Sequence, residues 1–364
     1  MIARLVWENL SHRPIRTLLS VLMIGVPVTL ILTLVGLING FVEDSHNRQS
    51  GVGADILFKP QGSNPVSFSN ASIPSKVVEL LAKEPHVAQA MGEVIAPIGG
   101  FDFLAGIDPA AFDRMSGGFD VVAGHGFAGP DDMLVDSWYA DQKHLKPGSD
   151  LKLLGHTWHV AGIVRPGKLA HIFVSMRPLQ ELEGTEGHVS QIYLKLDDKA
   201  AIETTVGYLK NKYEGYPVMS MAELESLISV DNVPLLKPFL DVIMGLGVFI
   251  AFMVVSLSMY MAVLQRTREI GILKSLGATK SLVMILILWE AFFMGLGGTI
   301  LGILFSFGTR SAIHAVMPAS LPQAIVYAWW PIAGAIAMGA ALLGALYPGM
   351  LAVRQDPIEA LAYE

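Results

Sequence analysis

Cysteine is absent from this chain, and charged side chains are scarce in it. Without cysteine there is no disulfide framework, so any water-exposed domain relies on packing alone. Three motifs are also missing: the nucleotide-binding Gly-x-x-x-x-Gly-Lys-Ser/Thr, the hydrolase Gly-x-Ser-x-Gly and the zinc-protease His-Glu-x-x-His. The residues therefore predict a protein that is not an enzyme, binds no cofactor itself and cannot hydrolyse ATP through a P-loop.

The low charge has a counterpart in high hydrophobicity. Charged residues make up 16% of the chain, hydrophobic residues 52%, and the mean hydropathy is +0.50. Soluble domains usually carry roughly 25% charged residues. This composition indicates a membrane protein.

The apolar residues are concentrated in uninterrupted runs. Because a helix rises 1.5 Å per residue, ~20 apolar residues cross the hydrocarbon core. The first run is longer than the 7 to 15 apolar residues of a cleaved signal peptide, which is the competing interpretation. Pro318, Pro322 and the pair Trp329–Trp330 divide the last run into a loop and a span. The predicted spans are Thr17–Val42, Val242–Gln265, Ser281–Thr309 and about 329–353.

Basic residues beside the predicted spans set the orientation, because Lys and Arg favour the cytoplasmic side. Eight of them precede the first span, separate the second from the third, or follow the fourth: Arg4, Arg13, Arg16, Arg266, Arg268, Lys274, Lys280 and Arg354. Only Arg310 follows the third span. We therefore expect a multi-pass membrane protein with both termini in the cytoplasm and the segment from about 43 to 237 outside it.

The segment 43–237 is long enough for a domain with its own core. It carries 16 Lys and Arg against 25 Asp and Glu, a net charge of −9, which argues against nucleic acid as a partner. Strands are predicted at Ala54–Lys59, Trp158–Val164, His171–Ser175 and Gln191–Leu196, and helices at Ser75–Lys83 and Ala200–Tyr213.

The predicted fold is an α-helical membrane protein with four transmembrane helices plus a mixed α/β extracytoplasmic domain inserted between helices 1 and 2. The predicted ranges are 1–42 for the N-terminal elbow and first span, 43–237 for the α/β domain, and 238–364 for spans two to four.

Histidines and one buried acid are the candidate chemical groups. His156 and His159 are three apart on a predicted strand and point to opposite faces, so with His171, His125 and His144 they predict no metal site. Glu290 is the one ionisable residue inside a span, where such residues need a partner or water. It marks either a substrate path or a hydrogen bond between helices.

Small residues on the last two spans predict close helix packing. Glycine at four-residue spacing lets helix backbones approach each other. The interface is either static or one that shifts during a working cycle. The predicted packing residues are Gly295, Gly298, Gly302, Gly339 and Gly344.

The segment between spans two and three is basic and amphipathic. If Arg268–Leu276 is helical, Ile272 and Leu276 share one stripe with Leu273 beside it, and Gly277 suits the helix end. Such a helix suits a groove on a soluble partner. It also suits the lipid headgroups, which is the alternative.

Three motifs carry a family resemblance. The segment Arg266–Ala278 reads Arg-Thr-Arg-Glu-Ile-Gly-Ile-Leu-Lys-Ser-Leu-Gly-Ala. The segment Tyr347–Leu361 ends in Pro-Ile-Glu-Ala-Leu, and Trp7–Leu19 leads into the first span. They resemble the coupling helix, the C-terminal signature and the N-terminal elbow of ABC transporter permeases of the MacB/FtsX/LolCE type. The order of one span, a large domain and three spans resembles that family as well.

The resemblance implies a split permease, without a fused ATPase domain, that works as a homodimer or heterodimer. Each copy would bind a separate ABC ATPase, which holds ATP and Mg, and a periplasmic adaptor can take part. The residues implied in ATPase coupling are Arg266, Arg268, Glu269, Ile270, Gly271, Ile272, Leu273, Lys274, Leu276, Gly277 and Ala278.

Export or envelope transport is the function the resemblance implies first. Members that extract lipoproteins or activate cell-wall hydrolases are the alternative within the family. A four-span membrane receptor or sensor, signalling through the same loop, is the alternative of another class.

Overall fold

The computed structural model describes residues 14–63, 71–99, 102–227, 236–317 and 319–355. The chain divides into two compact units. A helical unit holds Met1–Asn39, Leu235–Ala312 and Gln323–Glu364, and an α/β domain holds Gly40–Pro234 and Ile313–Pro322. Most of the predicted elbow, Trp7–Arg13, and the end of the C-terminal motif, residues 356–361, lie outside the described residues.

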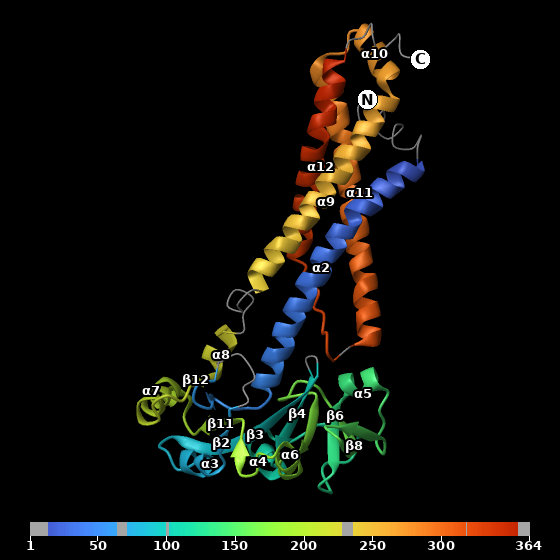
Figure 1. The fold of residues 1–364 in the computed structure, drawn as a ribbon. Helices are drawn as coiled ribbons and strands as arrows, with labels where there is room; N and C mark the ends of the chain where they lie inside the picture. The colour runs from blue at the N-terminus through green and yellow to red at the C-terminus, as the bar shows by residue number, and fades with distance from the viewer. Residues whose placement is uncertain (1–13, 64–70, 100–101, 228–235, 318, 356–364) are drawn as a thin grey trace. The chain divides into compact units, whose positions relative to one another are not determined.

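The α/β domain alternates strands with short helices (Figure 1). Its strands are β1 (Ile56–Phe58), β2 (Ile73–Pro74), β3 (Val87–Gly99), β4 (Asp102–Ile107), β5 (Val121–Gly124), β6 (Asp132–Asp136), β7 (Asp150–Leu153), β8 (His156–Val164), β9 (Ile172–Ser175), β10 (His188–Val189), β11 (Gln191–Leu196) and β12 (Val218–Ser220). Its helices are α3 (Lys76–Leu81), α4 (Pro109–Ser116), α5 (Ser137–Lys143), α6 (Met176–Glu183), α7 (Ile202–Lys212) and α8 (Met221–Leu227), with a 3-10 turn at Lys199–Ala201.

One sheet organises this domain. Its strand order is β12-β1-β11-β3-β4-β9-β6-β8-β5, with β7 paired to β8, and β2 and β10 form a separate pair. The long strand β3 joins the two halves, because Glu93 pairs with β11 whereas Val94 begins the pairing with β4. Neighbouring strands are antiparallel except for β4 with β9 and β6 with β8.

Local sequence explains where the short helices begin and end. The Asp108 carboxylate accepts the backbone N–H of Ala110 at the start of α4, and Gly117 ends that helix in the left-handed region at φ 76°. Asp136 caps α5 in the same way through the N–H of Tyr139. Side-chain caps of this kind satisfy donors that have no partner inside the helix.

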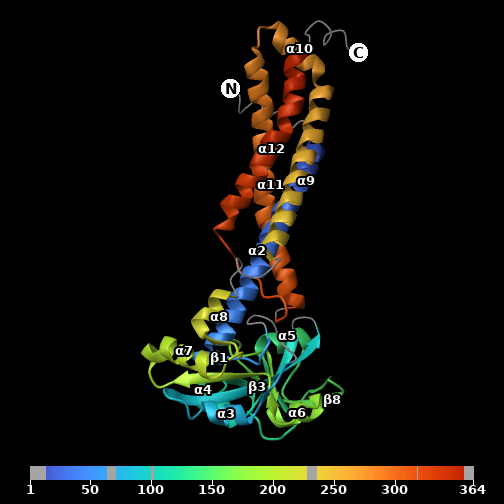
Figure 2. The same cartoon turned by 60° about the vertical axis from the view of Figure 1, so that its left-hand side comes forward.

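The helical unit contains most of each of the four long apolar helices (Figures 1 and 2). They are α2 (Pro14–Ser50), α9 (Leu236–Gln265), α11 (Lys280–Val316) and α12 (Trp329–Arg354), and the short α10 (Thr267–Ser275) lies between α9 and α11 in the chain. Both views show α9 and α12 side by side. All four are long and apolar enough to cross a membrane.

The fold predicted from the sequence is confirmed in class. Four candidate spans are present, and a mixed α/β domain lies in the chain between the first and second. The strands predicted near residues 54, 158, 171 and 191 match β1, β8, β9 and β11, and the two predicted helices match α3 and α7.

Helix α2 continues beyond the predicted end of the first span. It runs past Val42 to Ser50 because the polar residues that follow are satisfied within the helix and the α/β domain. Arg48 Nε lies 2.8 Å from Asp44 Oδ2 one turn earlier, and both side chains are buried. An i, i+4 pair of opposite charges supports a helix, so this pair favours the continuation of α2 beyond Val42.

Candidate functional site

Helix α10 forms the centre of the predicted coupling segment. It begins at Thr267, directly after the end of α9, and ends at Ser275. The N–H of Gly277 donates to the carbonyl of Lys274 and that of Ala278 to Leu273, while Gly277 has φ 95°. This pair of bonds is the Schellman motif, which needs a left-handed residue and therefore favours glycine. Gly277 and Ala278 thus set where α10 stops.

Helix α10 has one buried and one exposed apolar side. Ile270 is 8% exposed and packs into the core of the helical unit, with Gly271 buried beside it. Ile272, Leu273 and Leu276 are 43%, 38% and 81% exposed. We call these three side chains the apolar face of α10. Large apolar side chains grouped in this way mark an interaction surface.

Arg266 binds the buried acid of α11. Its Nη1 and Nη2 donate to Glu290 Oε1 at 2.9 and 3.0 Å, and its Nε lies 3.4 Å from Glu269. Glu290 is 4% exposed. Of the two interpretations of Glu290, the hydrogen bond between helices is therefore present. The pair connects the α9–α10 junction to the first third of α11, the chain's third candidate span.

Lys274 makes the second attachment of α10. Its Nζ donates to the backbone carbonyl of Val353 at 2.9 Å and also to that of Gln355. These carbonyls belong to the C-terminal end of α12, where a cation is favoured by the helix dipole. Helix α10 is thus bonded to both α11 and α12.

The coupling motif therefore divides into two groups. Arg268 and Glu269 are exposed together with the apolar face of α10. Arg266, Lys274, Ile270 and Gly271 make contacts inside the helical unit. Their role in ATPase coupling stays a prediction.

Glycines bring α2 and α11 into close contact. A Cβ at Gly298 would lie 2.5 Å from Ile24, and one at Gly302 would lie 2.5 Å from Val28 and 2.9 Å from the carbonyl of Gly25. Only glycine fits at such distances. Thr29 Oγ1 donates to the carbonyl of Gly302 at 3.1 Å, which adds a hydrogen bond to the same contact.

The remaining predicted glycines differ from one another. A Cβ at Gly344 would lie 2.6 Å from the carbonyl oxygen of Phe252 on α9, and one at Gly295 would lie 3.2 Å from Ala341 on α12. At Gly339, by contrast, no described atom outside its own turns of α12 lies within 4 Å of the added Cβ. The assignment of Gly339 to helix packing is therefore wrong for the single chain, because this residue points away from its neighbours.

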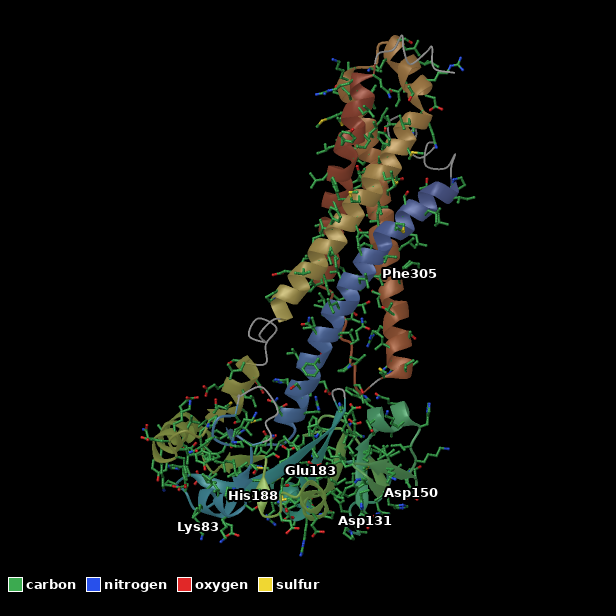
Figure 3. The ribbon with its side chains drawn as sticks, viewed as in Figure 1. Lys83, Asp131, Asp150, Glu183, His188 and Phe305 are labelled. Atoms are coloured by element: carbon green, nitrogen blue, oxygen red, sulfur yellow. The ribbon has the colours of Figure 1, made fainter. Side chains whose placement is uncertain are left out.

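The histidines of the α/β domain pair with separate carboxylates. His156 Nε2 lies 2.9 Å from Asp131 and His159 Nδ1 lies 3.0 Å from Asp150, on the part of the domain that β6 and β8 build (Figure 3). Within the described ranges, no group of three or more His, Cys, Asp or Glu side chains is arranged to hold a metal ion. His125 follows β5 and donates its backbone N–H to Ala161 of β8, and His144 ends α5.

His171 belongs to a buried ion cluster that the sequence did not indicate. Its Nδ1 lies 2.5 Å from Asp136 and its Nε2 3.6 Å from Asp44, whose carboxylate also meets Arg48. Burial lowers the pKa of His171, but the hydrogen bonds to Asp136 and Asp44 outweigh it and raise the pKa to about 9. The cluster fixes the last turns of α2 on the sheet. Opposite charges at residues 44 and 48 were its one sequence signal.

Two family models match this chain. The MacB-like periplasmic core domain matches residues 17–212, and the FtsX-like permease C-terminal domain matches residues 242–357. The chain belongs to the MacB/FtsX family of ABC transporter permeases. The second match includes the whole of α10 and Glu290, so the Arg266–Glu290 contact lies within the FtsX-like permease domain.

Similar curated proteins are permeases of the same kind. The chain is 28% identical over 226 residues to the ABC transporter permease YknZ of Bacillus subtilis, which covers 60% of this chain and 55% of that one. It is 27% identical over 225 residues to the ABC transporter permease YtrF of the same organism, covering 52% and 51%. The permease thus spans about half the length of the curated relatives it matches.

Two solved structures resemble the α/β domain at low similarity. The extracellular domain of YknZ from Gram-positive bacteria is 18% identical, covers 46% of this chain and 98% of that one, and gives a TM-score of 0.35. The periplasmic region of MacB from Actinobacillus actinomycetemcomitans is 15% identical, covers 49% and 94%, and gives 0.36.

Proposed function

We propose that this permease is the membrane subunit of an ABC transporter and that a separate ABC ATPase docks on the apolar face of α10. The exposure of Ile272, Leu273 and Leu276 is the observation that carries the proposal. Exposed Arg268 and Glu269 flank these side chains and suit a polar rim around an apolar centre. ATP and Mg would be held by the partner, and this chain would perform no hydrolysis.

Two contacts would transmit movement from the ATPase to the spans. Arg266 connects the start of α10 to α11 through Glu290, and Lys274 connects its end to α12. Because both attachments are short and at least one is buried, a displacement of α10 would move both helices with it. ATP would drive the cycle by binding one state of the ATPase more tightly than the other.

The proposed setting is the inner membrane of a bacterium. Both termini and α10 would lie in the cytoplasm, as the distribution of Lys and Arg predicts, and the α/β domain would lie outside. Two permease copies, identical or different, would form one transporter in the membrane lipid. If the substrate has to cross the periplasm after leaving the membrane, a periplasmic adaptor would bind the α/β domains.

Export or envelope transport is the proposed activity. One relative, 25% identical over 202 residues, is named a macrolide export ATP-binding/permease protein, MacB of Azoarcus. That alignment covers 54% of this chain and 27% of the relative. Its name supports export over the lipoprotein-extracting, hydrolase-activating and sensor alternatives.

Affinity purification tests the proposed class. The tagged chain is expressed in its own host, extracted in mild detergent, and its partners are identified by mass spectrometry. Recovery of an ABC ATPase supports the proposal, and an adaptor recovered with it supports export. Recovery of a kinase or a transcription regulator without an ATPase, in several detergents, would favour the sensor.

A further inference from the structure

The connection between α11 and α12 contributes to the α/β domain. Residues Ile313–Pro322 belong to that domain, whereas the residues before and after them in the chain belong to the helical unit. Ala319 is 2% exposed and lies in the same apolar core as Tyr139 of α5 and Trp158 of β8. Burial removes this apolar side chain from water and stabilises the contact. The connection is therefore packed into the core of the α/β domain.

Gln142, near the end of α5, is bonded to this connection through both polar atoms of its amide. Its Oε1 accepts the backbone N–H of Ala319 at 3.1 Å and that of Ser320 at 3.2 Å. Its Nε2 donates to Ser320 Oγ at 2.8 Å. Backbone N–H groups away from water need such partners, and a loop does not supply them through regular secondary structure. One side chain of the α/β domain therefore satisfies two backbone donors of the connection.

Ser320 extends this attachment to β4. Its Oγ lies 3.1 Å from both carboxylate oxygens of Asp102, the first residue of β4, so it donates its proton to Asp102 while it accepts from Gln142. A hydrogen bond to a carboxylate is roughly twice as strong as one between neutral groups. We call Asp102, Gln142, Ala319 and Ser320 the loop anchor. The loop anchor attaches the α11–α12 connection to a helix and a strand of the same domain.

Helix α5 is attached at its other end to the last turns of α2. The carboxylate of Asp136 accepts the N–H of Tyr139 at the start of α5 and also binds His171. His171 in turn lies 3.6 Å from Asp44 of α2. The start of α5 thus receives the helix that contains the first candidate span, and its end receives the connection that follows the third. Hydrogen-bond networks joined to rigid elements of this kind can carry coupling between distant sites.

We propose that the loop anchor transmits displacements of α11 and α12 to α5 and β4 of the α/β domain. This inference rests on the proposed function, which supplies the ATPase as the source of the displacement. Gln142 and Ser320 are positioning residues, because they hold the connection on the domain and take no part in docking on α10. A displacement that reaches the connection must either move α5 and β4 with it or break the hydrogen bonds of the loop anchor.

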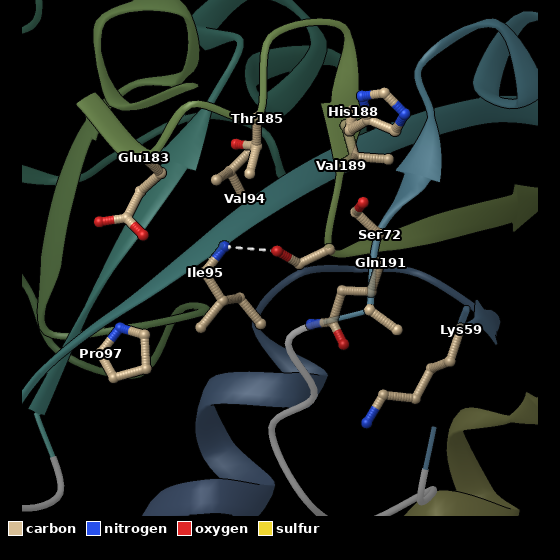
Figure 4. A pocket seen from close by; sticks show the side chains of 12 residues that line it. Lys59, Ser72, Val94, Ile95, Pro97, Glu183, Thr185, His188, Val189 and Gln191 are labelled. Atoms are coloured by element: carbon tan, nitrogen blue, oxygen red, sulfur yellow. Dashed lines mark hydrogen bonds between the residues drawn. The ribbon is translucent and has the colours of Figure 1, made fainter. Parts of the chain in front are cut away.

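Hydrogen exchange of the purified full chain in detergent tests whether the loop anchor holds the connection. Gln142→Ala removes the acceptor of two backbone N–H groups, so exchange in the segment 319–321 should become roughly tenfold faster. Ser320→Ala keeps that acceptor and should have a smaller effect. The matched control is Ser190→Ala, which removes the hydroxyl that accepts the N–H of Ile95 at 3.0 Å, drawn as a dashed line in Figure 4. This control should leave exchange in 319–321 unchanged, whereas unchanged exchange in Gln142→Ala would overturn the proposal.

Exchange in the complex with the ATPase tests transmission. The complex is compared without nucleotide and with Mg and a non-hydrolysable ATP analogue. In the unchanged protein and in Ser190→Ala, we expect the nucleotide to alter exchange in both α10 and α5. In Gln142→Ala the nucleotide response of α10 should remain and that of α5 should be lost. A purely structural role of Gln142 would instead raise exchange in α5 in both states and preserve the difference between them.

The absence of cysteine allows the loop anchor to be restored covalently. Asp102→Cys with Ser320→Cys removes the hydrogen bond between these residues, and a short bifunctional thiosulfonate then joins the two thiols through disulfides. The nucleotide response of α5 should be lost in this variant, return after cross-linking and be lost again after reduction. Persistence of the α5 response in Gln142→Ala, or its failure to return after cross-linking, would overturn the proposal. Absence of any nucleotide response in α10 of the unchanged complex would contradict the proposed function itself.

Discussion

Arg266 donates two hydrogen bonds from its guanidinium nitrogens to one carboxylate oxygen of Glu290, at 2.9 and 3.0 Å. The acid is 4% exposed on α11, and the arginine stands between α9 and α10. Removing one partner of a buried pair leaves the other charge uncompensated, which in soluble proteins costs about 3–5 kcal/mol. This pair is therefore a firm attachment of α10 to the helical unit.

Breaking the pair should impair coupling more than docking. Glu290→Gln keeps the size of the side chain and removes its charge, so Arg266 retains a neutral acceptor. We expect the ATPase to remain bound while the permease-dependent stimulation of ATP turnover falls several-fold. The measurement is ATPase activity of the reconstituted complex in proteoliposomes, alongside the amount of ATPase retained.

The exchanged pair provides the control for that prediction. Arg266→Glu with Glu290→Arg restores opposite charges across the same contact and should recover part of the turnover that either single change loses. Turnover in Glu290→Gln equal to that of the unchanged protein would contradict a transmitting role for the pair.

Two glycines of the helical unit should respond differently to the same substitution. Gly302→Val places a Cβ 2.5 Å from Val28, which is buried, so the α2–α11 contact must open. Overpacking of this kind costs typically about 1–3 kcal/mol. Gly339→Val is the matched control, because no described atom outside its own turns of α12 lies within 4 Å of the new Cβ. Thermal denaturation in detergent should show a lower midpoint for Gly302→Val only.

An equal fall of the denaturation midpoint in both variants would mean that Gly339 faces something the single chain does not contain, such as a second permease. A comparable midpoint for Gly302→Val and the unchanged protein would contradict the close α2–α11 packing.

The His171 cluster predicts that the α/β domain loses stability at alkaline pH. The pKa of His171 in the folded state, about 9, exceeds the ordinary histidine value of 6.5, so the folded state binds the proton more tightly. The contribution of His171 to the stability of the domain is therefore complete below about pH 6.5 and is lost as the pH rises through 9. The difference corresponds to about 3 kcal/mol of unfolding free energy.

Hydrogen exchange measures this loss locally. Protection of β9 and of the last turns of α2, corrected for intrinsic exchange rates, should fall between pH 7 and 10 in the unchanged protein. His171→Gln has no group that titrates there, so its protection should be lower but nearly constant. The same pH dependence in both proteins would assign the effect to another group.

Much of the fold was predictable because apolar runs and β-branched segments act locally. Uninterrupted hydrophobicity located the four spans, and Gly277 marked the end of α10 correctly. The strand β3 was missed because Val87–Gly99 contains Ala, Gly and Pro and shows no clear alternation. Its extended form depends on pairing with β11 and β4, which are distant in the chain.

The site was predictable in position but not in detail. Sequence motifs located α10 and its apolar face, and the cost of an intramembrane acid indicated that Glu290 needs a partner. They did not show that Arg266 is this partner, because the two residues meet only when α9 and α11 pack. The hydrogen bond of Lys274 could not be predicted for the same reason, because it forms only when the end of α12 lies beside α10.

The most direct test of the account is retention of the ABC ATPase by a permease whose apolar face has been made acidic. Ile272→Asp with Leu276→Asp changes only exposed side chains, and Leu80→Asp with Leu182→Asp makes the same chemical change on the α/β domain, where these leucines are 53% and 40% exposed. The account predicts that the unchanged and control proteins copurify with the ATPase in equal amounts, whereas the Ile272/Leu276 variant reaches the membrane folded and recovers almost none. Undiminished recovery of the ATPase with that variant would contradict docking on α10.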